Sequence, residues 1–196
     1  ASQCDIPSAL PLMYRAKNVV ILGDPYQLKH ICTLTTQLDQ CLAAKSRVMS
    51  LWQEMSYRDV SLFDLGARRA SESGREVLWL LEHYRSRREI IGFSNDRFYE
   101  NRLVIYTEEG PVPEGLPYGL HWDEVQFSAG SDKTNVDEAD RIESRIKAIR
   151  EHPEGEGLSI GVVTPFRRQA NLLDERLAYL GVVVGTAHRY QGDEKD

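Results

Sequence analysis

The sequence predicts an α/β protein in which a parallel β-sheet is flanked by helices. Short apolar runs with the composition of buried parallel strands lie at residues 19–22, 77–81, 103–106, 158–163 and 182–184. Amphipathic helical patterns separate several of these runs. Strand, helix, strand repeats of this kind form right-handed crossovers, so we expect parallel strands with helices over both faces of the sheet.

The spacing of apolar residues predicts two helices in the second half of the chain. One begins at Asn135, because Glu138 stands three residues further on in the pattern of a capping box, and it ends before Pro153. Its apolar face comprises Ala139, Ile142, Ile146 and Ile149. The other begins near Arg167 and ends at Gly181, a residue suited to the position after a helix. Its apolar stripe comprises Ala170, Leu173, Leu177 and Leu180.

The stretch from residue 29 to residue 75 has a different character. It is polar and contains no convincing strand, although helical patterns occur at residues 42–55 and 62–70. We expect a connector between two sheets. The predicted division is an α/β part at residues 1–40, a helical connector at 41–75 and a second α/β part at 76–196.

The charge of the chain limits how it could bind nucleic acid. The net charge is −6, with 24 Lys and Arg against 30 Asp and Glu. Broad sequence-independent binding surfaces need an excess of basic residues that displace counterions from phosphates. Any contact with a nucleic-acid strand is therefore expected to be local.

The cysteines and the hydropathy indicate the compartment. The three cysteines are odd in number and lack CxxC spacing, which favours reduced thiols. A zinc site from Cys4, His30, Cys32 and Cys41 is an alternative, but its spacing is unusual and we predict no metal site. No apolar run approaches the roughly 20 residues of a membrane span, and the start at Ala1 lacks signal-peptide character. We expect a cytoplasmic protein, or a nuclear one in a eukaryote, without membrane contact.

Polar loops follow four of the predicted strands. They read GDPYQL at residues 23–28, EHYRS at 82–86, TPFRRQ at 164–169 and GTAHRYQG at 185–192. Ligands of parallel sheets bind outside the carboxyl ends of the strands. Because each loop would leave this edge of its sheet, we expect the polar side chains to meet one ligand.

In this order and spacing, the four loops resemble the motor of superfamily 1 helicases, in particular the branch that includes nonsense-mediated-decay and 5′-to-3′ replication-type helicases. The resemblance covers nearly the whole chain, from ASQ at residues 1–3, which is similar to the end of a DEAxQ element, to GTAHRYQGDEKD at 185–196. It implies a RecA-like P-loop NTPase fold. Residues 1–40 would be the remnant of the first RecA-like domain, and 76–196 the second domain, truncated at its C-terminal end.

The resemblance implies ATP and Mg²⁺ as cofactors and assigns two catalytic residues. Gln27 would sense the γ-phosphate, and Arg85 would stabilise charge during phosphoryl transfer, for which a bidentate guanidinium is well suited. Further nucleotide contacts are implied for Asp24, Tyr84, Gly192 and Glu194, with Tyr84 stacking on the adenine. As alternatives, Gln27 could be a solvated turn amide and Arg85 could form a surface ion pair.

Nucleic-acid contacts are implied for two loops. The residues are Thr164, Pro165, Phe166, Arg168 and Gln169 in one loop and Thr186, His188 and Gln191 in the other. A hydroxyl and free N–H groups at a helix start can bind a strand phosphate. The alternative is a simple helix cap beside solvated arginines. His188 is given no acid–base role, because a lone histidine is more often structural.

Two features depart from the pattern of the family. Where relatives have a proline after the YR pair, Ser86 is followed here by Arg87 and Arg88, which alters how the next helix begins. The 196 residues also lack the glycine-rich phosphate loop and the acidic pair that binds magnesium. The fragment alone is therefore expected to be inactive.

The sequence thus predicts a fragment of an ATP-dependent helicase or translocase. The expected partners are single-stranded DNA or RNA and the protein's own N-terminal RecA-like domain. The alternative is a non-catalytic nucleic-acid or protein-binding module that retains the fold, since fold alone does not determine function. An unrelated α/β hydrolase would need a nucleophile elbow, and none is present.

Overall fold

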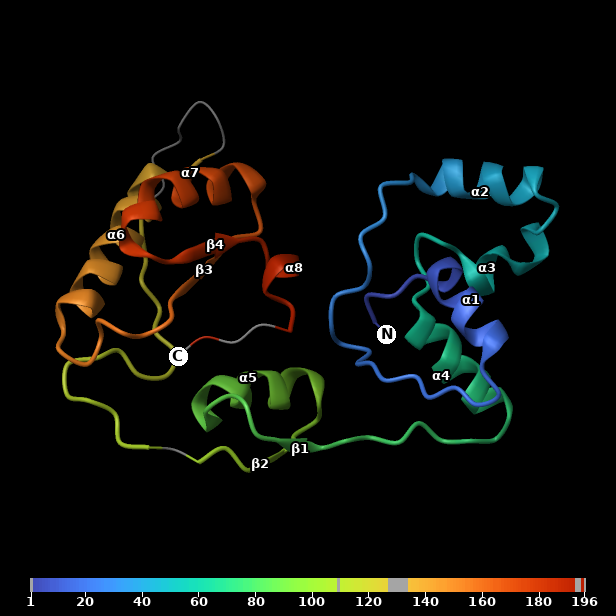
Figure 1. Ribbon diagram of the computed structural model, residues 1–196, viewed down its shortest axis with the longest axis horizontal. Coiled ribbons are helices and arrows are strands. Elements are labelled where there is room, and N and C mark those ends of the chain that lie inside the picture. Colours follow the sequence, from blue (N-terminus) through green and yellow to red (C-terminus); the bar gives the residue numbers. More distant parts are fainter. Residues whose placement is uncertain (1, 109, 127–133, 193–194, 196) are drawn as a thin grey trace. The chain divides into compact units, whose positions relative to one another are not determined.

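The computed structural model describes residues 2–108, 110–126, 134–192 and 195 (Figure 1). The chain forms two compact units, Ala1–Leu80 and Leu81–Asp196. The first unit contains both the stretch 1–40 and the stretch 41–75, and the division into a remnant, a connector and a second domain stays a prediction. Among the described residues, no helix has the length and apolar character needed to cross a membrane.

The first unit is helical. Its helices are α1 (Ile6–Arg15), α2 (Thr36–Lys45), α3 (Trp52–Met55) and α4 (Leu62–Glu72), with a 3₁₀ turn, η1, at Met49–Leu51. The pattern at residues 62–70 predicts α4, and this prediction is confirmed. The helical pattern at 42–55 is confirmed in large part, because this stretch contains the end of α2, η1 and α3, with a turn between α2 and η1 where Arg47 has a φ of 57°. Helix α1 was not predicted. It carries Pro11 in its interior, where proline is normally disfavoured.

Helices α1 and α4 each begin at a side-chain cap, and one backbone pairing joins the two starts. Asp5 caps α1 by accepting from the Ser8 N–H at 2.8 Å. Ser61 and Asp64 form a capping box at the start of α4. Asp5 and Ser61 also pair as an antiparallel bridge. The starts of the two helices are thereby joined above a small apolar cluster of Ile6, Met55, Val60 and Leu65.

The strands predicted at residues 19–22 and 77–81 are wrong. Both segments are irregular in the structure, and Val20, Leu22, Leu78 and Leu80 are exposed. A strand needs a neighbour to pair its backbone N–H and C=O groups, and an apolar run alone does not supply one. These segments have the composition of strands without the ladder of hydrogen bonds.

The second unit contains two pairs of parallel strands. Strand β1 (Glu82–His83) pairs with β2 (Val104–Ile105), and β3 (Gly161–Val163) pairs with β4 (Val183–Gly185). The apolar runs at 103–106, 158–163 and 182–184 therefore contain or overlap strands, and the predicted parallel direction is confirmed for both pairs. The α/β class is confirmed, although the strands form two small sheets.

The helices of this unit are α5 (Arg88–Phe98), α6 (Val136–Glu151), α7 (Arg167–Leu177) and α8 (Ala187–Tyr190), with a 3₁₀ turn, η2, at Ala178–Leu180. Both helical predictions are confirmed. Asn135 caps α6 and accepts from the Glu138 N–H at 3.0 Å. Gly181 follows η2 with a φ of 64°, in the left-handed region that glycine adopts readily.

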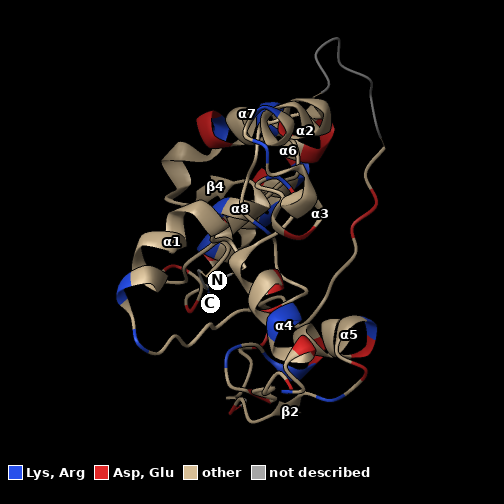
Figure 2. Cartoon of the chain, turned by 90° about the vertical axis from the view of Figure 1, so that its right-hand side faces the viewer, with Lys and Arg blue, Asp and Glu red and all other residues tan. Residues whose placement is uncertain are grey.

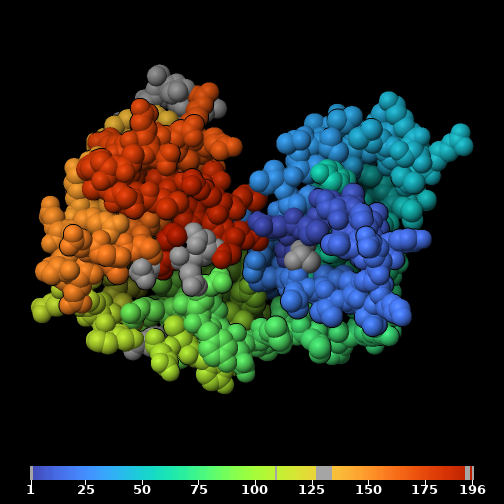
Figure 3. All heavy atoms as spheres, in the orientation of Figure 1, coloured from blue at the N-terminus to red at the C-terminus, as the bar shows by residue number. Residues whose placement is uncertain are grey.

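A single core joins α6 and α7 to the sheet of β3 and β4. Its buried members are Ala139, Ile146, Val162, Ala170, Leu173, Leu177 and Val184. Leu173 is 1% exposed and Leu177 is 0% exposed. The space-filling view shows these C-terminal elements, orange to red, in close contact with one another (Figure 3). This core fixes the loops that leave the carboxyl ends of β3 and β4.

Candidate functional site

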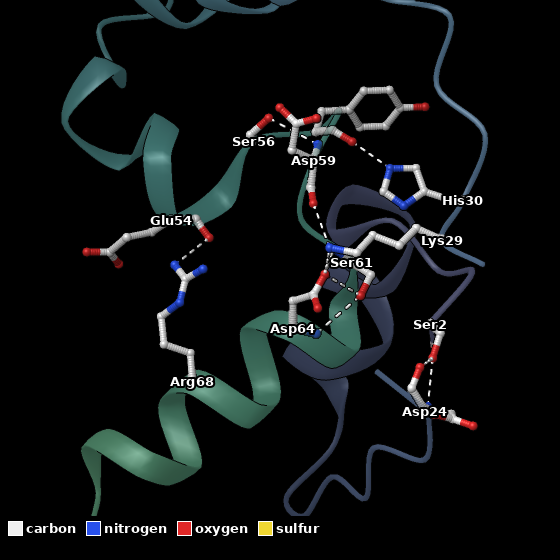
Figure 4. Close-up of polar contacts among 11 residues, drawn as sticks. Ser2, Asp24, Lys29, His30, Glu54, Ser56, Asp59, Ser61, Asp64 and Arg68 are labelled. Carbon is white, nitrogen blue, oxygen red and sulfur yellow. Dashed lines mark hydrogen bonds and ion pairs between the residues drawn. The ribbon is translucent and has the colours of Figure 1, made fainter. Parts of the chain in front are cut away.

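The loop GDPYQL of the first unit is held by hydrogen bonds around Asp24 (Figure 4). The Ser2 hydroxyl donates to the Asp24 carbonyl and accepts from the Asp24 N–H, both at 2.8 Å. The Asp24 carboxylate accepts from the Tyr26 N–H and from the Gln27 side-chain amide, both at 3.0 Å. Asp24 therefore forms the turn and orients Gln27, in agreement with the turn-forming character of Gly-Asp-Pro.

Helix α4 supports this loop on both sides. A Cβ atom on Gly23 would lie 2.5 Å from a ring carbon of Phe63, so the backbone approaches α4 as closely as glycine allows. Beyond the loop, Lys29 forms an ion pair with Asp64 at 2.7 Å and donates to the Asp59 carbonyl at 3.1 Å. Burial raises the pKa of Asp64, but the hydrogen bonds from Lys29 and Ser61 outweigh it and leave this pKa below its usual value.

The loop EHYRS follows β1 in the second unit. Arg85 is exposed at the end of this strand. The His83 Nε2 accepts from the Ser86 N–H at 2.8 Å, and Thr107 donates from its hydroxyl to the Ser86 carbonyl at 2.8 Å. Burial, together with the positive charge of Arg85, lowers the pKa of His83. A neutral His83 thus fixes the turn that carries Arg85.

Tyr84 stands at the same strand end and is 64% exposed. Its hydroxyl donates to Glu82 Oε2 at 2.9 Å. Its ring stacks on that of Tyr106, with centroids 5.5 Å apart and planes inclined by 16°. The hydrogen bond to Glu82 and then desolvation raise the pKa of Tyr84, so the phenol stays protonated at neutral pH.

Helix α5, which follows this loop, is tied to β2 by one buried amide. Asn95 is 7% exposed. Its Oδ1 accepts from the Leu103 N–H at 2.9 Å, and its Nδ2 donates to the Leu103 carbonyl at 3.3 Å. The amide therefore occupies both backbone groups of the residue that precedes β2. This pairing fixes the position of β2 relative to α5.

The two loops predicted to contact a strand are neighbours in the structure. The Thr164 N–H donates to the Gly185 carbonyl at 3.1 Å, which continues the pairing of β3 with β4 into both loops. Thr164 is buried at 6% exposure, and its Oγ1 accepts from the Phe166 N–H at 3.4 Å. Pro165, Phe166 and Arg168 are exposed beside it. The structure thus brings these two predicted groups of residues to one edge.

Gln169 is buried within this region at 3% exposure. Its Oε1 accepts from the Asn135 N–H at 2.8 Å, and its Nε2 donates to the Asn135 carbonyl at 2.9 Å. The Nε2 also donates to Glu138 Oε2 at 3.1 Å. In this structure the Gln169 amide joins the first turn of α7 to the start of α6. Its contact with a strand stays a prediction.

The last loop turns closely over β4. A Cβ atom on Gly185 would lie 2.6 Å from Arg189 Cδ, and Arg189 donates to the Val184 carbonyl at 2.7 Å. Tyr190 donates from its hydroxyl to the Val183 carbonyl. Of the predicted residues, Thr186 precedes α8, His188 is exposed, Gln191 is partly buried and Gly192 has a φ of 88°. Glu194 lies outside the described residues.

Acidic and basic side chains are mixed on the surface. Blue and red segments both occur along α4 and α5 in Figure 2, and the net charge is −6. Within the described parts of the chain, no group of three or more His, Cys, Asp or Glu side chains could hold a metal ion. The three cysteines are free. Gln27 and Asp24 lie in the first unit, whereas the other predicted residues lie in the second.

The structure adds supporting residues that the sequence did not single out. Ser2 holds Asp24, His83 and Thr107 hold the turn before α5, and Tyr106 stacks on Tyr84. The stack of Tyr106 on Tyr84 had no signal in the sequence, because it depends on the register of β1 with β2. The partners of Ser2 and Thr107, 22 and 21 residues away, had no local signal.

Pairs of parallel strands followed by polar loops are typical of an α/β protein. The model of a family described as an AAA domain matches residues 58–196, which is more than half of the chain. The chain belongs to this family, and its relatives identify it as a superfamily 1 helicase sequence, as the four loops predicted.

Several curated proteins are similar along nearly the whole chain. An uncharacterized ATP-dependent helicase of Mycoplasma pneumoniae is 24% identical over 100% of this chain and 18% of its own length. A probable helicase with a zinc finger domain from Danio rerio is 28% identical over 93% of this chain and 10% of its own length. The DNA replication ATP-dependent helicase/nuclease dna2 of Schizosaccharomyces pombe is 24% identical over 100% of this chain and 15% of its own length. The chain spans between 10% and 18% of the length of these relatives.

Proposed function

We propose that this chain is part of the motor of an ATP-dependent helicase or translocase, which couples ATP hydrolysis to movement along single-stranded nucleic acid. The observation that carries this proposal is the junction of Thr164 with Gly185, because it brings the two loops of the helicase pattern to one edge of a parallel pair. The names of the relatives support ATP-dependent helicase activity. We also propose that residues 76–196 form a RecA-like domain, in which helices flank a parallel sheet.

In this proposal the nucleotide binds between this chain and the protein's own N-terminal RecA-like domain. Bound ATP with Mg²⁺ supplies the phosphoryl group that is transferred to water. Arg85 stabilises charge on that group, and its exposure at the end of β1 suits this role. Gln27, oriented by Asp24, senses the γ-phosphate. Tyr84 stacks on the adenine, and Gly192 and Glu194 complete the nucleotide contacts.

The strand lies across the edge formed by the loops after β3 and β4. The exposed Phe166 offers a stacking surface, and Arg168 offers charge to a phosphate. Thr164, Pro165, Gln169, Thr186, His188 and Gln191 are the remaining proposed contacts. Since Thr164 and Gln169 are buried, we propose that they act chiefly by fixing the shape of the edge. Stacking and backbone contacts predict little sequence preference, for DNA or for RNA.

The experiment that tests this proposal replaces Arg85 in the full-length protein, which we expect to work in the cytoplasm or nucleus. Arg85→Ala should lower the strand-stimulated ATPase rate by about 10³ to 10⁵, the size of arginine-finger effects. Strand binding should persist, because Arg85 is assigned to the nucleotide. Steady-state phosphate release with DNA and with RNA, and fluorescence anisotropy of a labelled strand, measure the two properties.

Arg97→Ala is the matched control, because Arg97 lies in the last turn of α5, away from the loop. An Arg85→Ala rate equal to that of Arg97→Ala would contradict the assignment. If the intact protein shows no ATPase activity with either strand, the second candidate function, a non-catalytic binding module with the same fold, replaces the first.

A further inference from the structure

One face of the small sheet of β1 and β2 carries an aromatic pair. In this sheet Glu82 stands opposite Val104 and His83 opposite Ile105. The register continues by one residue, since the Tyr106 N–H donates to the His83 carbonyl at 2.8 Å. Tyr84 and Tyr106 are therefore at equivalent positions, and side chains at such positions lie on the same face. Their rings stack, with centroids 5.5 Å apart and planes inclined by 16°.

Tyr84 is held at two points. Glu82, two residues earlier on the same strand, accepts from the Tyr84 hydroxyl at 2.9 Å. Tyr106 covers one face of the Tyr84 ring. Tyr84 is nevertheless 64% exposed and Tyr106 53% exposed. The Tyr84 ring is thus fixed in direction while much of its surface remains accessible.

We propose that Tyr106 is a positioning residue for the nucleotide base. It stacks behind Tyr84 and holds that ring so that the adenine stacks on the opposite face. This inference rests on the proposed function, in which Tyr84 contacts the adenine. A ring that is already ordered loses less conformational freedom when a base binds to it, so the free energy of stacking is retained as affinity.

The role of Tyr106 concerns the flat base and not the phosphates. Truncating it should therefore raise the KM for ATP and leave kcat unchanged, because Arg85 and Gln27 act on the phosphates. An aromatic pair contributes enough to predict a rise of about three- to tenfold. The affinity for tripolyphosphate, which has no base, should stay the same. A general disturbance of the fold would instead lower the affinity for both compounds.

The test uses strand-stimulated ATP hydrolysis by the full-length protein. Tyr106→Ala should raise the KM, whereas Tyr106→Phe, which keeps the ring, should match the unaltered protein. Tyr14→Ala is the control for loss of an exposed tyrosine, because Tyr14 is 93% exposed in α1. Inhibition by tripolyphosphate is measured for each variant.

Two results separate this inference from the function on which it rests. If Tyr84→Ala raises the KM and Tyr106→Ala does not, Tyr106 has no positioning role and the proposed nucleotide site stands. If neither variant changes the KM, the assignment of Tyr84 to the adenine fails as well. Equal losses of affinity for ATP and for tripolyphosphate in Tyr106→Ala would also overturn the inference. So would an unchanged KM for ATP with a higher strand concentration needed for half-maximal stimulation.

Discussion

At the scale of single residues, His83 determines how the loop of Arg85 is held. Its Nε2 can accept from the Ser86 N–H only when the imidazole is neutral. Burial and the nearby Arg85 lower its pKa, so the folded chain favours the neutral form. The position of Arg85 therefore depends on the protonation state of His83, a residue to which the helicase pattern assigns no role.

This dependence predicts a loss of stability in mild acid. The folded pKa of His83 lies below the usual histidine value of about 6.5, so below about pH 6.5 the unfolded chain takes up the proton first. The contribution of His83 is complete above this value and is lost as the pH falls towards the folded pKa. Urea unfolding between pH 7.5 and pH 5.5 should show a smaller free energy of unfolding at the lower pH.

The matched variant for this measurement is His83→Gln, which keeps an acceptor and does not titrate. Its free energy of unfolding should change less across the same interval. Equal pH dependence in the two proteins would show that other groups cause the loss. Asp64 and Glu143 do not interfere, because their pKa values lie below this interval, that of Glu143 at about 2.

At the scale of elements, the loop GDPYQL depends on the close approach of Gly23 to α4. A methyl group at this position would meet the Phe63 ring at 2.5 Å, and Phe63 is itself buried at 9% exposure. Gly23→Ala should therefore lower the free energy of unfolding by about 1 to 3 kcal/mol, the usual cost of overpacking. Denaturant unfolding of the purified chain measures this change.

Gly92→Ala provides the control of opposite sign. Gly92 lies inside α5, and nothing is within 4 Å of the position that its Cβ would take. Alanine is the better helix former, so this variant should gain up to about 1 kcal/mol. A Gly23→Ala protein as stable as the unaltered chain would show that Phe63 moves aside without cost.

The helices α6 and α7 were predictable because their signals are local. Asn135, Glu138 and Gly181 act within a few residues of the helix ends that they define. Strands were less predictable, since pairing depends on a distant partner: residues 19–22 (VVIL) are more apolar than β3 (GVV) but form no ladder. The stack of Tyr84 on Tyr106 likewise becomes visible only when the register of β1 with β2 is known.

At the scale of the whole molecule, the order of four loops carried the family assignment. Each motif is short and common, but their order along the chain is unusual. The family match over residues 58–196 confirmed the assignment. The individual site residues stay predictions, because their roles depend on a nucleotide and a strand. Gln169 illustrates the reason: its motif indicates a strand contact, whereas its side chain is bonded to Asn135.

The chain by itself is predicted to show no ATP turnover. Its 196 residues contain no GxxxxGK[ST] phosphate loop, whose backbone N–H groups and lysine bind the phosphates in P-loop NTPases. Phosphate release by the purified chain should equal that of a buffer blank, with or without single-stranded DNA or RNA. Turnover that purifies with the chain and disappears in Arg85→Ala would contradict this expectation.

The amide of Gln169 also makes two distant helices depend on one another. It satisfies the N–H and the C=O of Asn135, 34 residues earlier, so the start of α6 is completed by the first turn of α7. Opening the start of α7 would expose the N–H and C=O of Asn135, and opening the start of α6 would leave the buried Gln169 amide without these two partners. In a hydrogen-exchange experiment, the amide protons of α6 and α7 should therefore exchange with a common opening free energy, as one cooperative unit.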